Sequence, residues 1–376
     1  MSAASTGTTP MGSVAVLRAQ DAAWRRPRLA LLGTGTVGRA FVARYGRLMR
    51  SDATGLPGLA LLANSREWRE CDSADEAAAL LDELNASAQA SGSTDFDAEG
   101  FAAGDLVVDA TASADVASRH AGWLARGIHV VSANKQGNGG ALDAARAIVA
   151  AQREGAAGYG DAATVGAGLP LIRSIRELLR GGDRIASVEG VLSGSLAWLL
   201  HHYDGVRPFS GLVREAREAG YTEPDPRIDL SGEDVRRKLL ILARAAGLPL
   251  EAEAVRVESL VPGVLARADA EQVDDLLQVL DAPLGERFAR ARREGARLCF
   301  VGGFVVAADG RIDAKVGLRE LPAAHPLCAG SGTDNRVAIR SCRYDAQPLV
   351  IQGPGAGAEV TAAALLDDVL AIFAAR

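Results

Sequence analysis

The chain has 376 residues, which suits about two domains, and its 48% apolar and 23% charged residues are typical of an ordinary globular protein. Its net charge of −6 argues against broad, nonspecific binding to nucleic acid, which requires clustered lysine and arginine side chains. No stretch reaches the ~18 apolar residues of a membrane helix, and the four cysteines lack metal-site spacing. We therefore expect a cytoplasmic protein with buried, reduced thiols, a small-molecule ligand, and neither a membrane nor a nucleic-acid partner.

The first 27 residues are rich in small residues and lack the apolar core of a secretory signal, so residues 1–27 are expected to be a flexible leader. From Arg28 onward, apolar runs that predict strands alternate with amphipathic stretches that predict helices. This alternation predicts an α/β fold with a doubly wound parallel sheet of the Rossmann type over residues 28–160. The strands are expected from Arg28 and at 58–65, 105–113 and 128–135, and the helices at 36–50, 74–85 and 114–126. The polar stretch 86–104 is expected to be irregular.

The pattern changes after Gly160, where amphipathic helices are followed by a group of strand-like runs. Helices are predicted at 210–219 and 232–246, and several strands from residue 296 onward. Residues 161–352 are therefore expected to form a second, α+β domain with its own sheet. The last segment, 353–376, is a glycine turn followed by a helix.

A G-x-G-x-x-G sequence lies between the first predicted strand and the first predicted helix. In such a turn the first glycine permits the tight bend, the second lets a pyrophosphate approach the backbone, and the third allows close packing of the helix. The helix N-terminus then faces the phosphates. We expect the whole turn to contact a dinucleotide: Gly33, Thr34, Gly35, Thr36, Val37 and Gly38.

The second predicted strand ends in Asn64, Ser65 and Arg66, without the acidic residue that would bind an adenine ribose hydroxyl. Arg66 could instead contact a 2′-phosphate by a charge-assisted hydrogen bond, which favours NADP and leaves NAD as the alternative cofactor. A solvent-facing surface arginine is the other interpretation of Arg66. Lys135 follows the fourth strand, at the edge of the sheet where ligands bind.

The predicted helix 232–246 carries Asp234 and Lys238 beside its buried stripe rather than on its polar face. One interpretation is structural: Ser231 and Asp234 approximate a capping box, and an acid four residues before a base forms a favourable ion pair. The other is catalytic, because a lysine placed against an apolar surface costs free energy that an ion pair alone recovers poorly. The loop before the helix favours the second, since prolines stiffen the chain around Glu223 and Gly220 permits an unusual backbone angle.

The segment "GYTEPDPRIDLSGEDVRRKLLILAR" resembles the signature of the homoserine dehydrogenases, and four further segments resemble that family in the same order. They are "SANK", "VGAGLPLIRSIRELL", "GVLSGSLAWLL" and "GPGAGAEVTAAALL". The resemblance extends over about residues 28–376 and is most similar to the dehydrogenase half of bifunctional aspartokinase–homoserine dehydrogenases. It implies reversible NAD(P)H-dependent reduction of L-aspartate 4-semialdehyde to L-homoserine, in threonine and methionine biosynthesis, by a homodimer. It also implies that the final helix packs back on the nucleotide domain.

The resemblance implies a role for each matching residue. Lys238 falls on the proton-transfer position, and Lys135 on the lysine near the nicotinamide. The implied substrate-binding residues are Glu223, Asp234 and Asp229. The implied cofactor contacts beyond the glycine turn are Thr111, Ser113, Gly220 and Gly357.

Members of the family often bind a monovalent cation through backbone carbonyls and a glutamate. Val165, Ala167 and Leu169 could supply the carbonyls, but Ala162 occupies the glutamate position and Asp161 lies one residue away. A semialdehyde dehydrogenase that oxidises to the acyl level is the nearest rival, and an NADP-binding sensor without activity is another. No segment resembling an aspartokinase or an appended regulatory domain is seen, so we expect little inhibition by threonine.

Overall fold

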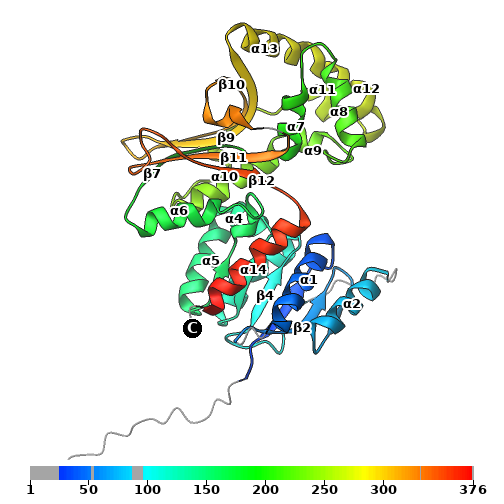
Figure 1. Ribbon diagram of the computed structural model, residues 1–376, viewed down its shortest axis with the longest axis vertical. Coiled ribbons are helices and arrows are strands. Elements are labelled where there is room, and N and C mark those ends of the chain that lie inside the picture. The colour runs from blue at the N-terminus through cyan, green and yellow to red at the C-terminus, as the bar shows by residue number, and fades with distance from the viewer. Residues whose placement is uncertain (1–24, 52–54, 87–95, 331, 375–376) are drawn as a thin grey trace, which may run out of the picture.

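The computed structural model describes residues 25–51, 55–86, 96–330 and 332–374, which form two sheets surrounded by helices (Figure 1). The predicted leader lies almost wholly outside these residues, as does part of the stretch 86–104. The first described residue, Arg25, donates hydrogen bonds of 2.7 Å to both carboxylate oxygens of the buried Asp105. The nucleotide domain is therefore anchored just ahead of its first strand.

The first sheet has the strand order β3-β2-β1-β4-β5-β6, parallel throughout except that β3 pairs antiparallel with β2. This confirms the predicted doubly wound fold. The two strands that the sequence analysis missed, β3 and β6, are three and two residues long. The bounds are β1 Arg28–Leu32, β2 Gly58–Ala63, β3 Trp68–Glu70, β4 Leu106–Asp109, β5 His129–Ser132 and β6 Tyr159–Gly160. The helices between them are α1 Thr36–Arg50, α2 Ala74–Ala86, α3 Ala114–Ala125, α4 Gln136–Gly139 and α5 Leu142–Glu154.

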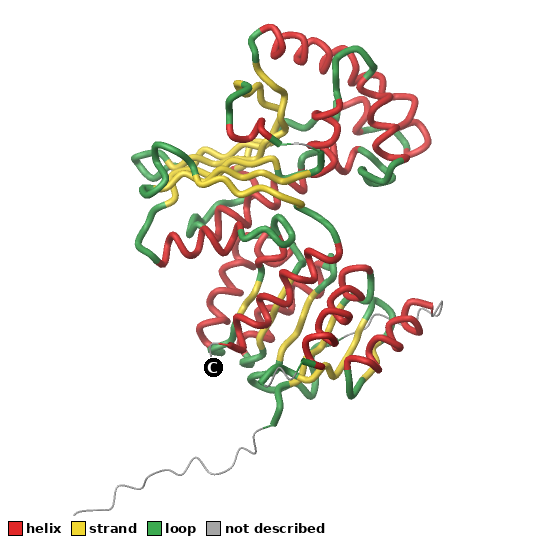
Figure 2. The backbone as a smooth tube through the Cα atoms, viewed as in Figure 1, coloured by secondary structure: helices red, strands yellow, loops and turns green. Residues whose placement is uncertain are grey.

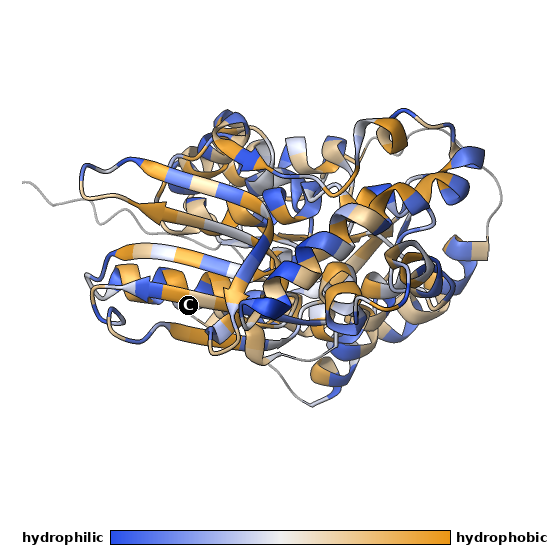
Figure 3. Cartoon of the chain, turned by 90° about the horizontal axis from the view of Figure 1, so that it is seen from above, coloured by the Kyte–Doolittle hydropathy of each residue, from blue (hydrophilic) through white to orange (hydrophobic). Residues whose placement is uncertain are grey.

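The second sheet has the order β12-β11-β7-β9-β10-β8 and is antiparallel except for the β10–β8 pair. Hydrophobic and hydrophilic residues interchange along its strands, as Figure 3 shows, because the main core packs on one face only. Helices α6 and α10 cover that face. The strands are β7 Ile185–Val191, β8 Val255–Val257, β9 Ala296–Val306, β10 Ile312–Pro322, β11 Asp334–Ser341 and β12 Leu349–Pro354.

Several other helices of the second domain form a lobe at one end of the sheet, away from α6 and α10 (Figures 1 and 2). The α-helices are α6 Leu171–Arg180, α7 Gly194–His202, α8 Phe209–Glu218, α9 Arg227–Leu230, α10 Glu233–Ala245, α11 Gly263–Ala266, α12 Val273–Leu276 and α13 Asp281–Arg293. The 3-10 helices are η1 Ala162–Thr164, η2 Ala252–Ala254, η3 Ala270–Gln272, η4 Leu277–Leu280 and η5 Pro326–Ala329. Within the described ranges, no helix has the length and apolarity needed to cross a membrane.

The two domains meet where α10 packs on α4, the short helix that begins directly after Lys135. Arg244 on α10 donates hydrogen bonds of 2.6 and 2.7 Å to the carbonyls of Asn138 and Gly140. A side chain at Gly139 would lie 2.5 Å from the Arg237 side chain, so the helices approach closely only because this residue is glycine. The last helix, α14 Ala358–Ala374, crosses back and packs on α1, as the resemblance implied (Figure 1).

Candidate active site

A cavity of about 660 Å³ opens at the carboxyl edge of the first sheet, next to the glycine turn. Its lining contains seven predicted site residues or neighbours: Gly33, Thr34, Gly35, Ser65, Arg66, Thr111 and Ser113. It also contains residues that the sequence analysis did not single out: Asn85, Phe96, Asp115, Val116 and Arg119. Gly220 (φ +74°) and Gly357 (φ +125°) adopt the backbone angles that favour glycine, yet neither is among the lining residues.

The glycine turn fits a dinucleotide phosphate. A side chain at Gly33, whose φ is +100°, would lie 2.8 Å from the carbonyl oxygen of Ala110, and one at Gly38 would lie 1.9 Å from that of Gly33. At Gly35, the residue before α1, a side chain would meet no protein atom within 4 Å. The backbone is therefore tightly packed at the first and third glycines and open at the second, where a phosphate has to approach the helix N-terminus.

The far end of the cavity is built around Asn64. Its side-chain oxygen accepts hydrogen bonds from the backbone N–H groups of Arg66 and Glu67, at 2.8 and 2.9 Å, and so turns the chain after β2. The Arg66 guanidinium donates to the carbonyl of Leu84 at 3.2 Å. This contact holds Arg66 at the cavity wall, where its charge adds to that of Arg119.

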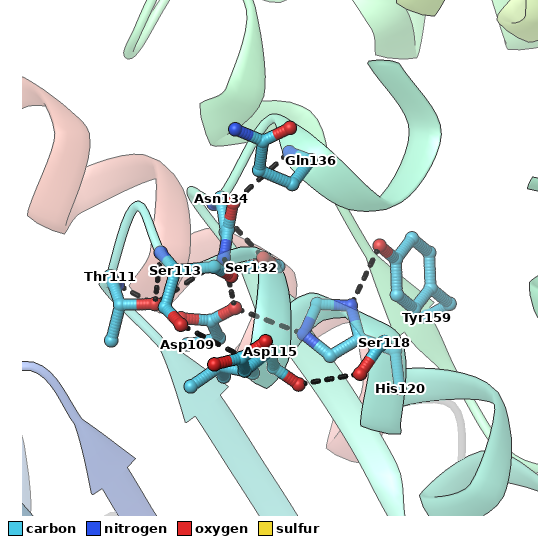
Figure 4. Close-up of polar contacts among 11 residues, drawn as sticks. Asp109, Thr111, Ser113, Asp115, Ser118, His120, Ser132, Asn134, Gln136 and Tyr159 are labelled. Carbon is cyan, nitrogen blue, oxygen red and sulfur yellow. Dashed lines mark hydrogen bonds and ion pairs between the residues drawn. The ribbon is translucent and has the colours of Figure 1, made fainter. Parts of the chain in front are cut away.

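A set of hydrogen-bonded polar side chains lies at the same edge of the sheet (Figure 4). We call it the Asp109 network, and its members are Asp109, Thr111, His120, Asn134 and Tyr159. His120 Nε2 lies 2.9 Å from Asp109 Oδ2, and His120 Nδ1 lies 3.2 Å from the Tyr159 hydroxyl. Asn134 and Thr111 donate to Asp109 at 3.0 and 2.7 Å. Burial, and then the nearby carboxylates Asp161 and Asp109, hold the pKa of Tyr159 well above its usual range.

The Asp109 network fixes the loops that carry three predicted site residues. The Asn134 amide also donates to the carbonyl of Ser113 at 2.7 Å and so ties the β4 loop to the β5 loop. Its oxygen accepts from the backbone N–H of Gln136 at 3.0 Å, which holds the turn around Lys135. No local sequence pattern indicates this arrangement, since Asp109 and His120 belong to different elements of the chain.

Lysines from both domains converge on Asp234. Lys238 Nζ lies 2.8 Å from Asp234 Oδ2, and Lys135 Nζ lies 3.6 Å from Asp234 Oδ1. We call these three residues the lysine cluster. Burial alone would raise the pKa of the Asp234 carboxyl, but the positive charges of Lys238 and Lys135 outweigh it, and the pKa lies below its ordinary value.

Lys238 is the buried member of the lysine cluster, with only 11% of its side chain exposed against 45% for Asp234. Besides the ion pair, its ammonium donates a 2.7 Å hydrogen bond to the carbonyl of Leu192, which follows β7. The capping-box interpretation is wrong. Helix α10 has Gly232 as its N-cap residue, with φ +80° and no side-chain cap, while Ser231 accepts from the Glu233 N–H at 3.2 Å.

Glu223 is exposed, on the loop that precedes α9 and α10. Its backbone N–H donates to Asp229 Oδ2 at 2.8 Å, and the Ser195 hydroxyl donates to Asp229 Oδ1 at 2.6 Å. Asp229 thus links the Glu223 loop to the start of α7. The neighbouring Thr222 hydroxyl is buried and has no hydrogen-bond partner among the described residues.

In the turn predicted to hold a cation, the carboxylate of Asp161 pairs with an arginine of the chain. Asp161 is buried and accepts from Arg176 at 2.5 and 2.9 Å and from Asn138 at 2.6 Å. Asp161 therefore neutralises Arg176, and a cation would meet the charge of that guanidinium. For this reason Asp161 does not fit the role of a cation ligand beside the carbonyls of Val165, Ala167 and Leu169.

The four cysteines are all free, but the prediction that all are buried is correct only for Cys71 and Cys328, because Cys299 is half-buried and Cys342 is exposed. Burial raises the pKa of Cys71 and of Cys299 to about 12, and it also raises the pKa of Cys328. None of the four lines the nucleotide cavity. A thiol with a raised pKa holds little of the thiolate that attacks a carbonyl.

Two family models match the chain. The family model described as "Homoserine dehydrogenase, NAD binding domain" matches residues 33–159, and the model described as "Homoserine dehydrogenase" matches residues 170–370. Together these matches cover both domains.

Two similar proteins have homoserine dehydrogenase in their names, and a similar solved structure has no function assigned. A bifunctional aspartokinase/homoserine dehydrogenase 2 of Zea mays is 45% identical over 270 residues, which is 70% of this chain and 29% of that protein. The chain thus spans less than a third of the length of this relative. A homoserine dehydrogenase of Schizosaccharomyces pombe is 36% identical over 82% of this chain and 81% of its own. A solved structure of a Candida auris protein of unknown function superposes with a TM-score of 0.81 at 32% identity, covering 92% of this chain and 98% of that one.

Proposed function

The chain belongs to the homoserine dehydrogenase family, and we propose that it reversibly reduces L-aspartate 4-semialdehyde to L-homoserine with NADPH. The observation that carries the proposal is the convergence of Lys135 and Lys238, from different domains, on Asp234 at the edge of the first sheet. Reduction of an aldehyde needs a cofactor site on one side and a proton donor on the other, and the two domains supply one each.

The nicotinamide cofactor, when bound, supplies the hydride that joins the aldehyde carbon. In this proposal Lys238 gives a proton to the carbonyl oxygen, so that one C–H bond and one O–H bond form, and it takes the proton back in the reverse direction. An ammonium group has three N–H donors. Two have partners among the described residues, the Leu192 carbonyl and Asp234, which leaves one for the substrate oxygen.

The acidic residues suit an amino-acid substrate. We propose that Glu223 and Asp234 bind the α-ammonium group of the semialdehyde, because both carboxylates are at least partly exposed. Asp229 acts through Glu223 by holding its backbone. Lys135 polarises the substrate oxygen or anchors the cofactor, and its 3.6 Å distance from Asp234 leaves it free to shift towards either.

We also propose that NADPH is preferred and that Arg66 contacts its 2′-phosphate, since Arg66 lines the cavity at the end of β2. Replacing Arg66 with alanine should lower kcat/KM for NADPH by roughly tenfold to hundredfold, the scale of a charge-assisted hydrogen bond, and change NADH use much less. Arg69→Ala is the matched control, because Arg69 lies on β3 outside the cavity lining. Equal losses with the two cofactors would refute this role.

The reaction itself is tested by incubating the purified chain with aspartate semialdehyde and NADPH and identifying the product by mass spectrometry. Homoserine formed in step with NADPH consumption is the expected result. The rival oxidation to the acyl level needs a nucleophilic thiolate, and the raised pKa values of Cys71 and Cys299 argue against it. Absence of homoserine would overturn the proposal. Light scattering of the same preparation tests the homodimer, which we propose from the family resemblance.

A further inference from the structure

The second domain contains a cavity of about 500 Å³ that shares no lining residue with the nucleotide cavity. Its walls come from α7, α13, β9, β11 and the 3-10 helix η5. A volume of this size suits a small metabolite. The proposed reaction does not use this cavity, so a ligand bound there would have a different role.

Arg336 is the buried charged side chain in the lining of this second cavity. It lies on β11, is only 2% exposed, and donates to the Gln352 side chain at 3.2 Å and to the Leu327 carbonyl at 3.3 Å. Its Nη2 is buried and has no hydrogen-bond partner among the described residues. A buried guanidinium donor without a partner costs free energy that a suitable acceptor would recover.

The surroundings of Arg336 are positive and apolar. Arg292 and Arg297 stand at the exposed rim, and Asp334 is the acidic residue of the lining. Asp334 already accepts from Gln352 at 3.2 Å. Apolar side chains form much of the remaining wall, among them Phe288, Leu298 and Phe300. An anion with an aliphatic body would therefore find both a charge partner and an apolar surface.

We propose that this cavity binds a small organic carboxylate, with its carboxyl group on Arg336 and its aliphatic part against the apolar wall. A carboxylate matches the two parallel N–H donors of a guanidinium. A single negative charge suits the site better than a dianion, because Asp334 lies on the same wall. The proposal does not rest on the dehydrogenase activity, since the cavity shares no lining residue with the nucleotide cavity and none of the three residues of the lysine cluster lines it.

Two cysteines in the cavity wall can be used to detect a bound ligand, because a ligand would shield them from a labelling reagent. Cys299 and Cys328 line the cavity with their sulfur atoms 4.0 Å apart, whereas Cys342 is exposed and lies outside it. Because burial raises the pKa of both thiols, the full chain would be labelled with iodoacetamide at about pH 9 until both cysteines react, with and without pentanoate, and the labelling of each cysteine followed by mass spectrometry. Pentanoate should slow labelling of Cys299 and Cys328 but leave Cys342 unchanged. Pentanamide, which has the same body without the charge, should protect neither.

Binding constants measured by calorimetry complete the test. Arg336→Gln should weaken pentanoate binding roughly tenfold or more, as expected for loss of a charged hydrogen-bond donor. Arg340→Gln, on the same strand but outside the lining, should leave it unchanged. If Arg336→Gln fails to fold, Arg297→Gln at the exposed rim should still weaken binding severalfold. Absence of protection in the unmodified chain, or equal protection by pentanamide, would overturn the proposal.

Discussion

The Asp109 network and the lysine cluster lie at the same edge of the first sheet, yet they differ in how far they are closed. In the network, the side chains of Asp109 and His120 are both fully buried, and each is hydrogen-bonded to its neighbours. In the lysine cluster, Asp234 is 45% exposed and Lys135 is 36% exposed. A ligand could reach Asp109 or His120 only by breaking their hydrogen bonds, whereas the partly exposed lysine cluster can accept a ligand without such a loss.

The difference in exposure suggests that the Asp109 network positions loops, whereas the lysine cluster takes part in the reaction. Buried polar groups stabilise a fold only when every partner is present, and a satisfied network holds its loops in one geometry. The lysine cluster has two cations on one carboxylate, so positive charge remains to meet a developing alkoxide. We therefore expect changes in the network to affect mainly stability, and changes in the cluster to affect mainly turnover.

The largest effect is expected from Lys238→Ala, which should lower kcat by ~10²–10⁴, the usual scale of general acid–base catalysis. Its melting temperature should change little, because the partner that is left behind, Asp234, is 45% exposed and water can solvate its charge. Steady-state kinetics and a thermal melt measure the two quantities together. Lys315→Ala is the control, since Lys315 is an exposed lysine on β10. A Lys238→Ala enzyme with near-normal kcat would end the catalytic interpretation.

The network should show the opposite pattern. Asp109→Asn replaces a charged acceptor that contacts His120, Thr111 and Asn134, and loss of hydrogen bonds to a charged group costs about 1.5–3 kcal/mol. The expected result is a clear fall in melting temperature, with a smaller loss of kcat than for Lys238→Ala. Asp143→Asn, which removes a 92% exposed carboxylate, is the control. A stable Asp109→Asn protein with abolished turnover would reverse the assignment of the two clusters.

The features that could be predicted from the sequence lie within short, continuous stretches of the chain. The glycine turn and α1 were predicted to the residue, because strand, turn and helix are consecutive and their signals are local. The pairing of Asp234 with Lys238 was also predictable, since four residues form one turn of a helix. Both features depend on short stretches of chain.

Contacts between distant segments left no such signal. Lys135 meets Asp234 because α10 packs on α4, and nothing in either segment indicates that contact. His120 reaches Asp109 only through the packing of α3 against the sheet. The short helices between α10 and β9 were also missed, because four-residue elements are too brief to show a periodic pattern.

A smaller effect is expected from Asp234→Asn, which keeps the shape of the side chain and removes its charge. If Asp234 binds the substrate ammonium group, KM for the semialdehyde should rise by roughly tenfold, the loss of one charged hydrogen bond, with little change in KM for NADPH. Asp234 caps no helix, so its replacement carries no capping penalty. Glu233→Gln on the same turn is the control, as Glu233 pairs with Arg236 at the surface. An unchanged KM for the semialdehyde would remove Asp234 from the substrate site.

The smallest expected effect is the pH dependence of the stability that Asp234 contributes. This dependence distinguishes the partly exposed lysine cluster from a buried ion pair. The pKa of Asp234 is lowered by Lys238 and Lys135 in spite of burial, so folding favours the ionised form. Its contribution to stability is therefore present above the ordinary aspartate pKa of about 3.9 and is lost as the pH falls through the lowered value. For a partly exposed pair this contribution is only about 0.5 kcal/mol, or a melting shift of ~1–2 °C. Thermal melts of the natural protein and Asp234→Asn at pH 7, 5 and 3.5 should show this gap narrowing with acidification. A gap that widened would mean that desolvation outweighs both lysines and that the cluster is closed like the network.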